Sequence, residues 1–335
     1  MNKYISLILL ALFPALFISC ETDFDVTAEY KEVAIVYGLL NQKDSIQYLR
    51  INKAFLGEGN SLVYAQIADS SSFGKNIDVV LTETNELGIK RDIVFDTVTL
   101  FNKESGVFYS PGQLFYSSTE KLDQNSAYEL KITNSKTGLE VTSSTNLIHN
   151  FNFTKPSSGS KTISFKRSFT QPMKFAWKNA VNGKRYQMRL HFNFTELSPA
   201  GDSTHRKITW TFPESVTEKI DGTGESEAAY TNAEFYTFCE ANIPYTDQSA
   251  EDAVVKRFAA NCDLEVTVAG DEFSTYLDAN GPTTGVLIDK PVYSNILNGL
   301  GLFSCRYQIV KSILLSPETI LDLSTTTTLK FAKPN

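Results

Sequence analysis

The stretch YELKITNSKTGLEV, residues 128–141, decides the fold class of this chain. Tyr128, Leu130 and Ile132 alternate with polar residues, which is the pattern of a strand with one buried face. Residues 134–138 then supply turn-forming side chains and a glycine before a second alternating segment begins. The stretch therefore predicts a β-hairpin.

Similar strand patterns lie on both sides of this hairpin. Residues 33–37 form a continuous apolar run, residues 77–81 and 186–194 alternate, and residues 208–212 supply a return strand. The short strands up to residue 150 predict an immunoglobulin-like β-sandwich over residues 30–150, whereas those at 186–194 and 208–212 fall in a second region.

A second β-rich domain with a few short helices is expected over residues 151–335. The boundary is predicted by the small-residue stretch at 155–160, which contains a proline. The fold class is therefore mainly β. Further local predictions are three short helices, at 230–241, at 271–280 and from Ser249 through Phe258, and a β segment or frayed end at 324–328.

Residues 1–19, MNKYISLILLALFPALFIS, indicate a signal peptide. Lys3 precedes an apolar run that is shorter than the ~20 residues of a membrane-spanning helix. The small residue before Cys20 resembles the bacterial lipobox, although Phe17 and Ile18 depart from its preferred pattern. We expect Cys20 to carry acyl chains such as palmitate, with residues 20–29 as a lipid-anchored tether. An ordinary secretory signal followed by a chance cysteine is the alternative.

The tether is acidic. Glu21, Asp23 and Asp25 follow Cys20 and resemble the surface-export signals of Bacteroidota lipoproteins. We therefore expect a protein of the cell outer membrane that faces either the periplasm or the surface. A solvated tether without a signal fits the same residues equally well.

Composition and motifs argue against several function classes. The net charge of −7 argues against a nucleic-acid partner. The sequence has no nucleophile elbow, phosphate-binding loop, dinucleotide fingerprint or paired Cys-x-x-Cys. His149, His191 and His205 are too scattered to predict a zinc site. We expect no metal and no cofactor, and the sequence favours a non-catalytic role.

Three cysteines remain beyond Cys20. Cys262 and Cys305 each lie in an alternating apolar pattern, and the cell envelope permits disulfides. We predict a Cys239–Cys262 disulfide with Cys305 as a buried free thiol. Three small buried residues without a disulfide are the alternative.

Three triplets fit the acceptor pattern of protein O-glycosylation in Bacteroidota. Their acceptor residues are Ser45, Thr97 and Ser203. Ser203 is the best candidate because it lies in a predicted exposed loop.

One segment near the C-terminus has two interpretations, a ligand-contacting loop or a turn whose glycines allow positive φ. Its candidate residues are Tyr293, Asn295, Asn298, Gly299, Gly301 and Phe303.

The pattern Asn-Ile-x-Asn-Gly-x-Gly-x-Phe of that segment resembles a Bacteroidota outer-membrane lipoprotein family, catalogued as a domain of unknown function. The strands at 33–38 and 77–81, and residues 106–109 leading to 128–132, add to the resemblance. Such lipoproteins are often encoded near TonB-dependent transporters. The resemblance implies a non-catalytic accessory or binding protein with a transporter, glycan or peptide partner, and it implies no catalytic residues.

Two other functions fit the sequence. A surface hydrolase would place two carboxylates of the second domain ~5–10 Å apart in a cleft. A structural or adhesive surface protein would show an exposed apolar patch and no pocket. Trp177 and Trp210 bear on this choice, because buried rings favour a structural role and an exposed aromatic platform favours sugar binding; we expect Trp210 to be buried.

Overall fold

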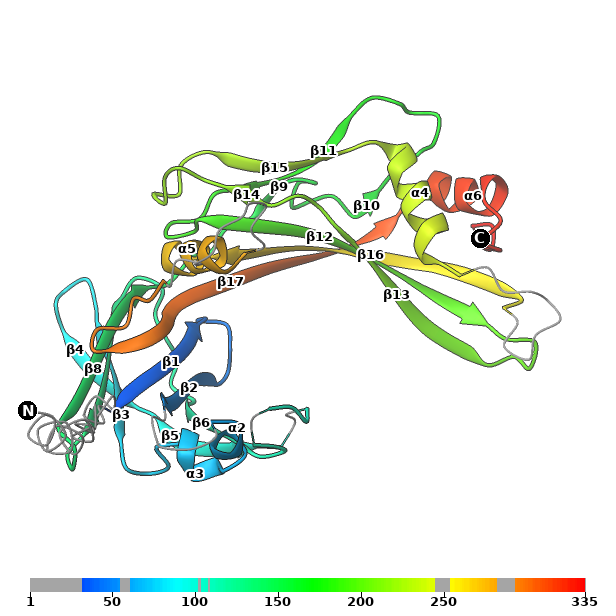
Figure 1. Ribbon diagram of the computed structural model, residues 1–335. Helices are drawn as coiled ribbons and strands as arrows, with labels where there is room; N and C mark the ends of the chain where they lie inside the picture. The colour runs from blue at the N-terminus through cyan, green and yellow to red at the C-terminus, as the bar shows by residue number, and fades with distance from the viewer. Residues whose placement is uncertain are drawn as a thin grey trace, which may run out of the picture. The chain divides into compact units, whose positions relative to one another are not determined.

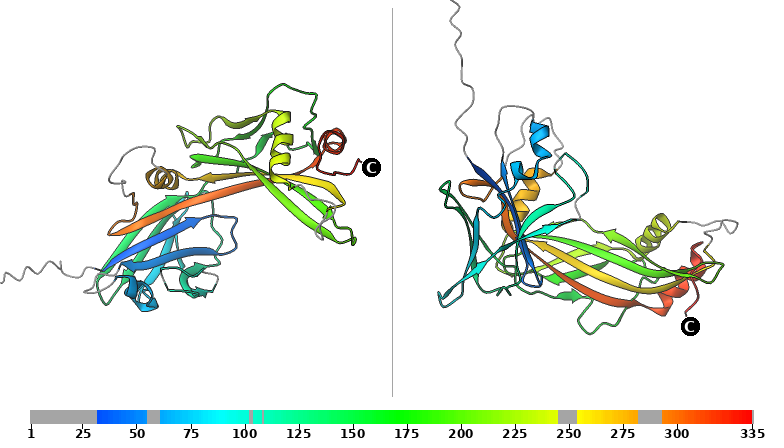
Figure 2. Two further views of the ribbon diagram at one scale, coloured as in Figure 1. Left: turned by 45° about the vertical axis from the view of Figure 1, so that its right-hand side comes forward. Right: turned by 90° about the horizontal axis from the view of Figure 1, so that it is seen from below.

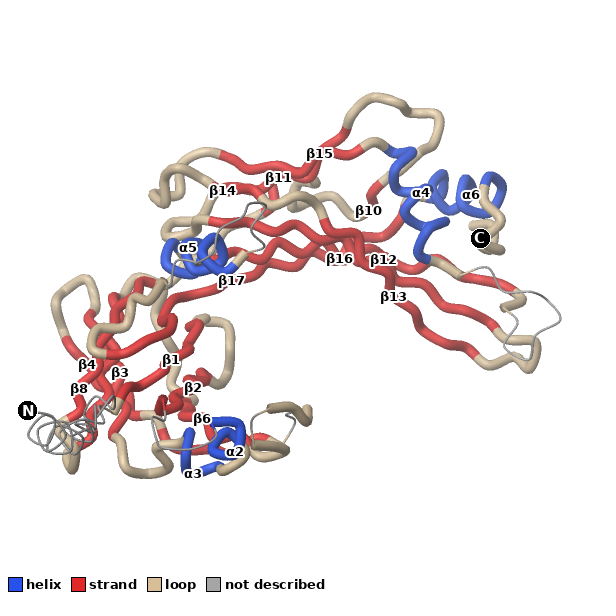
Figure 3. Tube along the Cα trace, viewed as in Figure 1, coloured by secondary structure: helices blue, strands red, loops and turns tan. Residues whose placement is uncertain are grey.

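The computed structural model of the protein describes residues 32–54, 61–101, 104–107, 109–244, 254–281 and 293–334. The predicted signal peptide, Cys20, the tether and Ser249 lie outside these residues. Within them the fold is mainly β, with several sheets and few short helices (Figure 3), which confirms the predicted fold class. None of the described helices is long and apolar enough to cross a membrane.

The N-terminal strands form a sandwich-like arrangement. They are β1 (Val33–Leu40), β2 (Gln47–Ala54), β3 (Asp78–Thr84), β4 (Lys90–Val94), β5 (Asp96–Leu100), β6 (Gln113–Ser118), β7 (Ala127–Asn134) and β8 (Leu139–Asn146). One group has the order β1-β2-β6-β5 and the other β4-β3-β7-β8. Val36, Leu49, Leu81 and Leu130 from the two groups are buried in one core. Two short helices, α2 (Ser61–Ala65) and α3 (Ala68–Ser71), follow β2.

The hairpin predicted from residues 128–141 is confirmed. Strands β7 and β8 pair antiparallel, with Ile132 opposite Val141, and Tyr128, Leu130 and Ile132 are buried. Gly138 has a φ of 74°, a value that favours glycine at this turn position.

The C-terminal part adds β9 (Phe153–Lys155), β10 (Thr162–Ile163), β11 (Met173–Lys178), β12 (Arg185–Leu197), β13 (Ser203–Thr211), β14 (Ser215–Val216), β15 (Glu225–Tyr230), β16 (Lys256–Ala269) and β17 (Gly299–Leu315). Strands β13, β12, β16 and β17 lie side by side in that order, as Figure 2 shows. A smaller sheet, β15-β11-β9, contributes Phe175 and Trp177 to the core that also contains Leu190 and Val266.

Strand β17 joins the two parts. Its first residues, Gly299–Cys305, pair in parallel with β1, and Arg306–Leu314 pair antiparallel with β16. One sheet therefore runs β13-β12-β16-β17-β1-β2-β6-β5 across the predicted boundary near residue 151 (Figure 1). The predicted division into two domains at that point stays a prediction, but the strands on either side share backbone hydrogen bonds.

Two of the three predicted helices form. These are α4 (Asn232–Asn242), with a capping box between Thr231 and Glu234, and α5 (Asp271–Asn280). The third prediction is wrong for its described part, because Phe258 lies in strand β16 opposite Thr195 of β12. Cross-strand pairing overrides the helical spacing of Val254 and Phe258.

The run at 324–328 was predicted as a β segment or frayed end, and this is also wrong. It belongs largely to a helix, α6 (Pro317–Thr326), which begins with Pro317 after the capping hydroxyl of Ser316. The hydroxyls of Thr325 and Thr326 donate to carbonyl oxygens four residues earlier, which satisfies these polar groups within the helix.

A buried ion pair attaches the C-terminal segment to the long sheet. The Arg257 guanidinium, whose side chain is 1% exposed, donates from Nε to Glu196 Oε1 at 2.9 Å. Its other nitrogens donate to the carbonyl oxygens of Leu329 at 2.8 Å and Pro244 at 3.0 Å. Arg206 donates to the second oxygen of the same carboxylate at 2.9 Å, but its side chain is 59% exposed.

We expect Arg257→Ala to lower the free energy of unfolding by about 3–5 kcal/mol, because it leaves the Glu196 carboxylate and two carbonyl groups without their buried donor. Arg206→Ala is the matched control on the same carboxylate and should cost about 1 kcal/mol or less, since solvent screens that pair. Urea denaturation of the two variants measures the difference. Equal losses would show that burial does not set the strength of these contacts.

Candidate functional site

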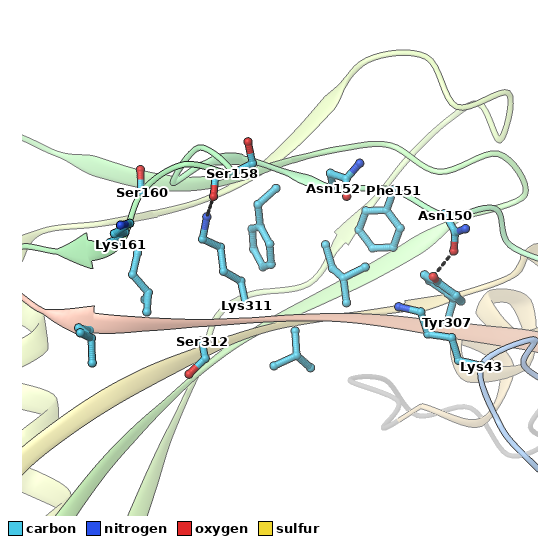
Figure 4. A pocket seen from close by; sticks show the side chains of 15 residues that line it. Lys43, Asn150, Phe151, Asn152, Ser158, Ser160, Lys161, Tyr307, Lys311 and Ser312 are labelled. Atoms are coloured by element: carbon cyan, nitrogen blue, oxygen red, sulfur yellow. Dashed lines mark hydrogen bonds between the residues drawn. The ribbon is translucent and has the colours of Figure 1, made fainter.

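An open groove of about 1060 Å³ runs along β17 (Figure 4). Its floor is the inner face of β17, and its far wall is the segment that includes β9 and leads to β10. The lining residues are Lys43, Asn150, Phe151, Asn152, Phe153, Ser158, Ser160, Lys161 and the β17 residues Tyr307 and Ile309 through Leu314. We call this feature the β17 groove.

The groove follows a stretch of β17 that lacks a strand on one edge. β1 pairs with this edge up to Cys305, and β10 pairs with it again from Leu314. The opposite edge is occupied throughout by β16, from Arg306 to Leu314. Among the residues that the structure describes, 306–313 therefore have no strand partner on the groove side.

Two backbone hydrogen bonds establish which way the backbone groups of β17 point. Gly270 N–H donates to Cys305 C=O on the β16 side, whereas Leu314 N–H donates to Lys161 C=O on the groove side. Because alternate residues of a strand point the same way, the N–H and C=O groups of Val310 and Ser312 face the open edge. On this edge Lys43 Nζ donates to Gln308 C=O at 3.3 Å.

The groove is positively charged. Lys43, Lys161 and Lys311 line it, and its lining contains no carboxylate. Within the described residues, none of these three lysines has a carboxylate within 4.0 Å. Lys311 instead donates to the carbonyl oxygens of Ser157 and Ser158, the latter at 3.3 Å. This contact ties the far wall to the floor.

Two of the three aromatic residues of the groove are held in the core, and the third, Phe153, is half-buried. Tyr307 is 1% exposed and Phe151 is 5% exposed, with their ring centroids 6.0 Å apart. Tyr307 also donates its hydroxyl proton to Asn150, and Lys43 lies 4.5 Å from its ring centroid. These rings form a rigid floor, and neither is exposed as a flat platform for stacking.

The predicted binding loop at 293–303 mainly serves the fold. Asn295 donates to Phe303 C=O at 2.6 Å and accepts from Phe303 N–H at 2.9 Å, so its amide replaces a neighbouring strand. Leu297 pairs with Thr142 of β8, and Asn298 turns the chain with a φ of 58°. Asn295 and Leu297 also line a smaller hollow over β7 and β8.

The other residues of that loop are close to protein atoms. A Cβ on Gly299 would lie 2.8 Å from Ala34 C=O, and one on Gly301 would collide with Val36 C=O of β1. Tyr293 is half-buried, and burial followed by the nearby Glu272 and Asp271 raises the pKa of its hydroxyl. The glycines are thus explained by close approach of two backbones.

The predicted Cys239–Cys262 disulfide is absent from the structure, in which Cys239, Cys262 and Cys305 are all free and buried. Burial, and then the neighbouring Cys262, raise the pKa of the Cys239 thiol. Burial also raises the pKa of Cys262, and it raises that of Cys305 to about 12. The alternating pattern correctly placed Cys262 and Cys305 inside, but a pattern cannot establish that two sulfur atoms are bonded.

The predicted glycosylation residues differ in accessibility. Ser45 is exposed in the turn between β1 and β2, and Ser203 is exposed at the start of β13. Thr97 is half-buried within β5, opposite Tyr116.

The outer face of the long sheet carries a polar array. His191 Nδ1 lies 2.8 Å from Thr209 Oγ1, and its Nε2 lies 3.6 Å from Glu265. Glu265 also binds Arg189 at 3.2 Å, while Asp263 accepts from Asn193 at 2.7 Å. The described residues contain no group of three or more His, Cys, Asp or Glu placed to hold a metal ion. Each carboxylate of this face is engaged by its neighbours.

The two tryptophans lie inward. Trp177 is 1% exposed, and the half-buried Trp210 stacks on Phe238 with ring centroids 5.5 Å apart. Neither forms an exposed aromatic platform, so the expectation for Trp210 is confirmed in part.

Sequence reasoning missed the β17 groove. Its three lysines are widely separated in the chain, and the stretch at 155–160, interpreted as a domain boundary, forms part of its wall. The open edge begins where β1, more than 250 residues away in the chain, stops pairing with β17. No local signal reports such a pairing.

We expect Gly301→Ala to lower the free energy of unfolding by about 3 kcal/mol or more, because the methyl group would collide with Val36 C=O at a φ of 115°. Gly159→Ala is the control, since its Cβ would meet nothing within 4 Å and its φ is not positive, and it should change stability by less than about 1 kcal/mol. Urea denaturation compares them. A Gly301→Ala variant as stable as the control would contradict the close approach of β1 and β17.

Thiol titration tests the cysteine states. In a Cys20→Ser variant that has not been reduced, we expect three thiols to react with a disulfide reagent after unfolding in urea. Almost none should react in the folded protein at pH 8, because burial and raised pKa values keep the thiols protonated. One reactive thiol after unfolding would instead reveal the Cys239–Cys262 disulfide.

No protein-family model matches the chain, and no curated protein matches it. Among solved structures it is similar to the C-terminal globular domain of oligosaccharyltransferase from Pyrococcus abyssi, at 9% identity and a TM-score of 0.27. The similarity covers 85% of this chain and 50% of that one, so the chain spans about half the length of that protein. A likeness this distant says nothing about function, and the resemblance to Bacteroidota lipoproteins stays a prediction.

Proposed function

We propose that this protein is a non-catalytic binding protein, anchored to the outer membrane through acylated Cys20 and associated with a TonB-dependent transporter. The β17 groove is its ligand-binding surface. The observation that carries the binding role is an open, cationic groove over a strand edge that has no partner. The anchor and the transporter rest on the lipobox-like residues and on the family resemblance.

The chemistry of the groove supports binding over catalysis. Its lining offers ammonium groups, amides, hydroxyls and backbone groups, and it contains no histidine, cysteine or carboxylate. General acid–base catalysis needs a group that exchanges protons near neutral pH. The groove can therefore hold an anionic or hydrogen-bonding ligand, but it lacks the usual acid–base residues.

The hydrolase alternative has less support. Asp263 and Glu265 lie two residues apart on one face of β16, but they are bound by Asn193 and Arg189 on the outer face of the sheet. None of the described hollows is lined by either carboxylate. A glycosidase pair must flank a bond held in a cleft.

The anchor is tested by metabolic labelling with an alkyne analogue of palmitate. We expect the wild-type chain to be labelled and to sediment with membranes, and Cys20→Ser to lose both properties because the acyl chains are its attachment. Cys239→Ala is the control that should keep the label. A labelled Cys20→Ser variant would overturn the anchor.

The association is tested by affinity purification of the tagged lipoprotein from its native membrane, followed by mass spectrometry. Recovery of one TonB-dependent transporter in near-equal amount supports the accessory role. Repeated recovery of no outer-membrane partner would remove the transporter from the proposal.

A further inference from the structure

We propose that the β17 groove receives an extended acidic segment of a partner protein, which adds a strand to β17 in the gap between β1 and β10. This proposal rests on the proposed binding function and names the occupant of the same groove. Strand addition to an exposed sheet edge is a common mode of peptide recognition.

The gap has the length of a short strand. It spans residues 306–313 of β17, between the last pairing with β1 at Cys305 and the first pairing with β10 at Leu314. At ~3.3 Å per residue the gap is about 26 Å long. Both β1 and β10 run parallel to β17 on this edge. A bound segment would fill the gap between them, so that this edge of β17 would be paired along its whole length.

The edge offers matched hydrogen-bonding groups. Val310 and Ser312 present their backbone N–H and C=O groups to the gap, and Gln308 C=O accepts from the Lys43 ammonium at 3.3 Å. Unpaired strand edges attract further strands unless they are covered or charged. Here the far wall stands over the floor without pairing with these residues, which leaves the edge open to an incoming backbone.

The charges select an acidic occupant. Lys43 lies toward one end of the gap and Lys161 at the other, with Lys311 on the floor between them. The groove is thus locally positive in a chain of net charge −7. Because side chains alternate along a strand, acidic residues at every second position would share one face of the added strand, with the central one beside Lys311 and the outer two toward Lys43 and Lys161.

A sugar fits this surface less well. Glycan recognition uses exposed aromatic faces, whereas Phe151 and Tyr307 are packed into the core. A peptide backbone supplies the alternating donors and acceptors that the open edge lacks.

The first experiment measures binding of a labelled peptide, acetyl-Thr-Glu-Val-Asp-Val-Glu-Thr-amide, to the full-length lipoprotein in detergent by fluorescence anisotropy. We expect saturable binding. Two analogues that are N-methylated at alternate residues, one in each frame, keep the charge but block backbone pairing, and at least one should bind about tenfold more weakly or not at all. An analogue with lysine in place of each acidic residue should not bind.

Variants test the location of the site. Lys161→Glu should weaken peptide binding about tenfold, whereas Lys207→Glu, the same charge change on an exposed residue of β13, should not. Val310→Pro removes one edge-facing N–H without touching the ladder to β16, so it should weaken binding by a similar factor.

Hydrogen exchange of the unmodified protein gives a readout that does not depend on how a variant folds. The amides of Val310 and Ser312 should exchange fast in the free protein and slow down when peptide is added. Protection at β13, which forms the end of the sheet, instead of at residues 306–313 would overturn the proposal.

Other results also overturn strand addition. These are binding of both N-methylated peptides as tightly as the unmodified peptide, equally tight binding of polygalacturonate, or undiminished peptide binding by both Lys161→Glu and Val310→Pro. If the transporter still co-purifies in those cases, the proposed function stands and only its occupant is wrong. If the peptide binds and protects β17 while no transporter co-purifies, strand addition stands and the transporter association fails.

Discussion

The pairing of β17 with two different partners is the constraint on which the rest of the structure depends. Its first part lies parallel to β1 and its second part antiparallel to β16. Buried backbone N–H and C=O groups must be hydrogen-bonded, and those of β17 are hydrogen-bonded to β1 and to β16. The strand therefore joins the N-terminal and C-terminal strands into one sheet. The same division leaves the groove edge of residues 306–313 without a strand, because β1 ends before β10 begins.

The close contact between β1 and β17 explains why the C-terminal motif has its composition. Gly299 and Gly301 allow the backbone of β1 to approach, and Asn298 turns the chain. Asn295 hydrogen-bonds both backbone groups of Phe303, which lies before the part of β17 that pairs with β16. A segment that resembles a ligand-binding loop in sequence thus serves mainly to pair strands within the fold. Its residues are specific because they fix the register of the strand that borders the groove.

Local patterns predicted the elements that have a clear alternation, turn or cap in their own sequence. The hairpin at 128–141, the strand at 186–194 and the helices α4 and α5 follow from alternation, turn residues and caps. The wrong predictions concern segments whose secondary structure is set by contacts with other parts of the chain or by residues outside the segment. Phe258 is extended because it pairs with β12, and the threonines of α6 are helical because Ser316 and Pro317 begin the helix and Leu323 is buried.

The candidate site could not be predicted for a related reason. No lysine of the β17 groove stands out in its local sequence. The three lysines come together only because of where β1 and β10 end in the sheet. Cysteine placement shows the same limit, since the alternation predicted burial of Cys262 and Cys305 but gave no geometry for a bond to Cys239. Patterns report which face of an element is buried, not which distant element covers it.

An unpaired edge in a long sheet can pair with the same edge of a second copy of the chain. The charges of the groove affect how favourable such pairing is. Two copies placed edge to edge along residues 306–313 would bring Lys43, Lys161 and Lys311 of one copy near those of the other. Like charges across an interface cost free energy, whereas an acidic strand meets the same lysines with favourable interactions. The arrangement that disfavours self-association is therefore the one that favours an acidic partner, and a single set of lysines can provide both effects.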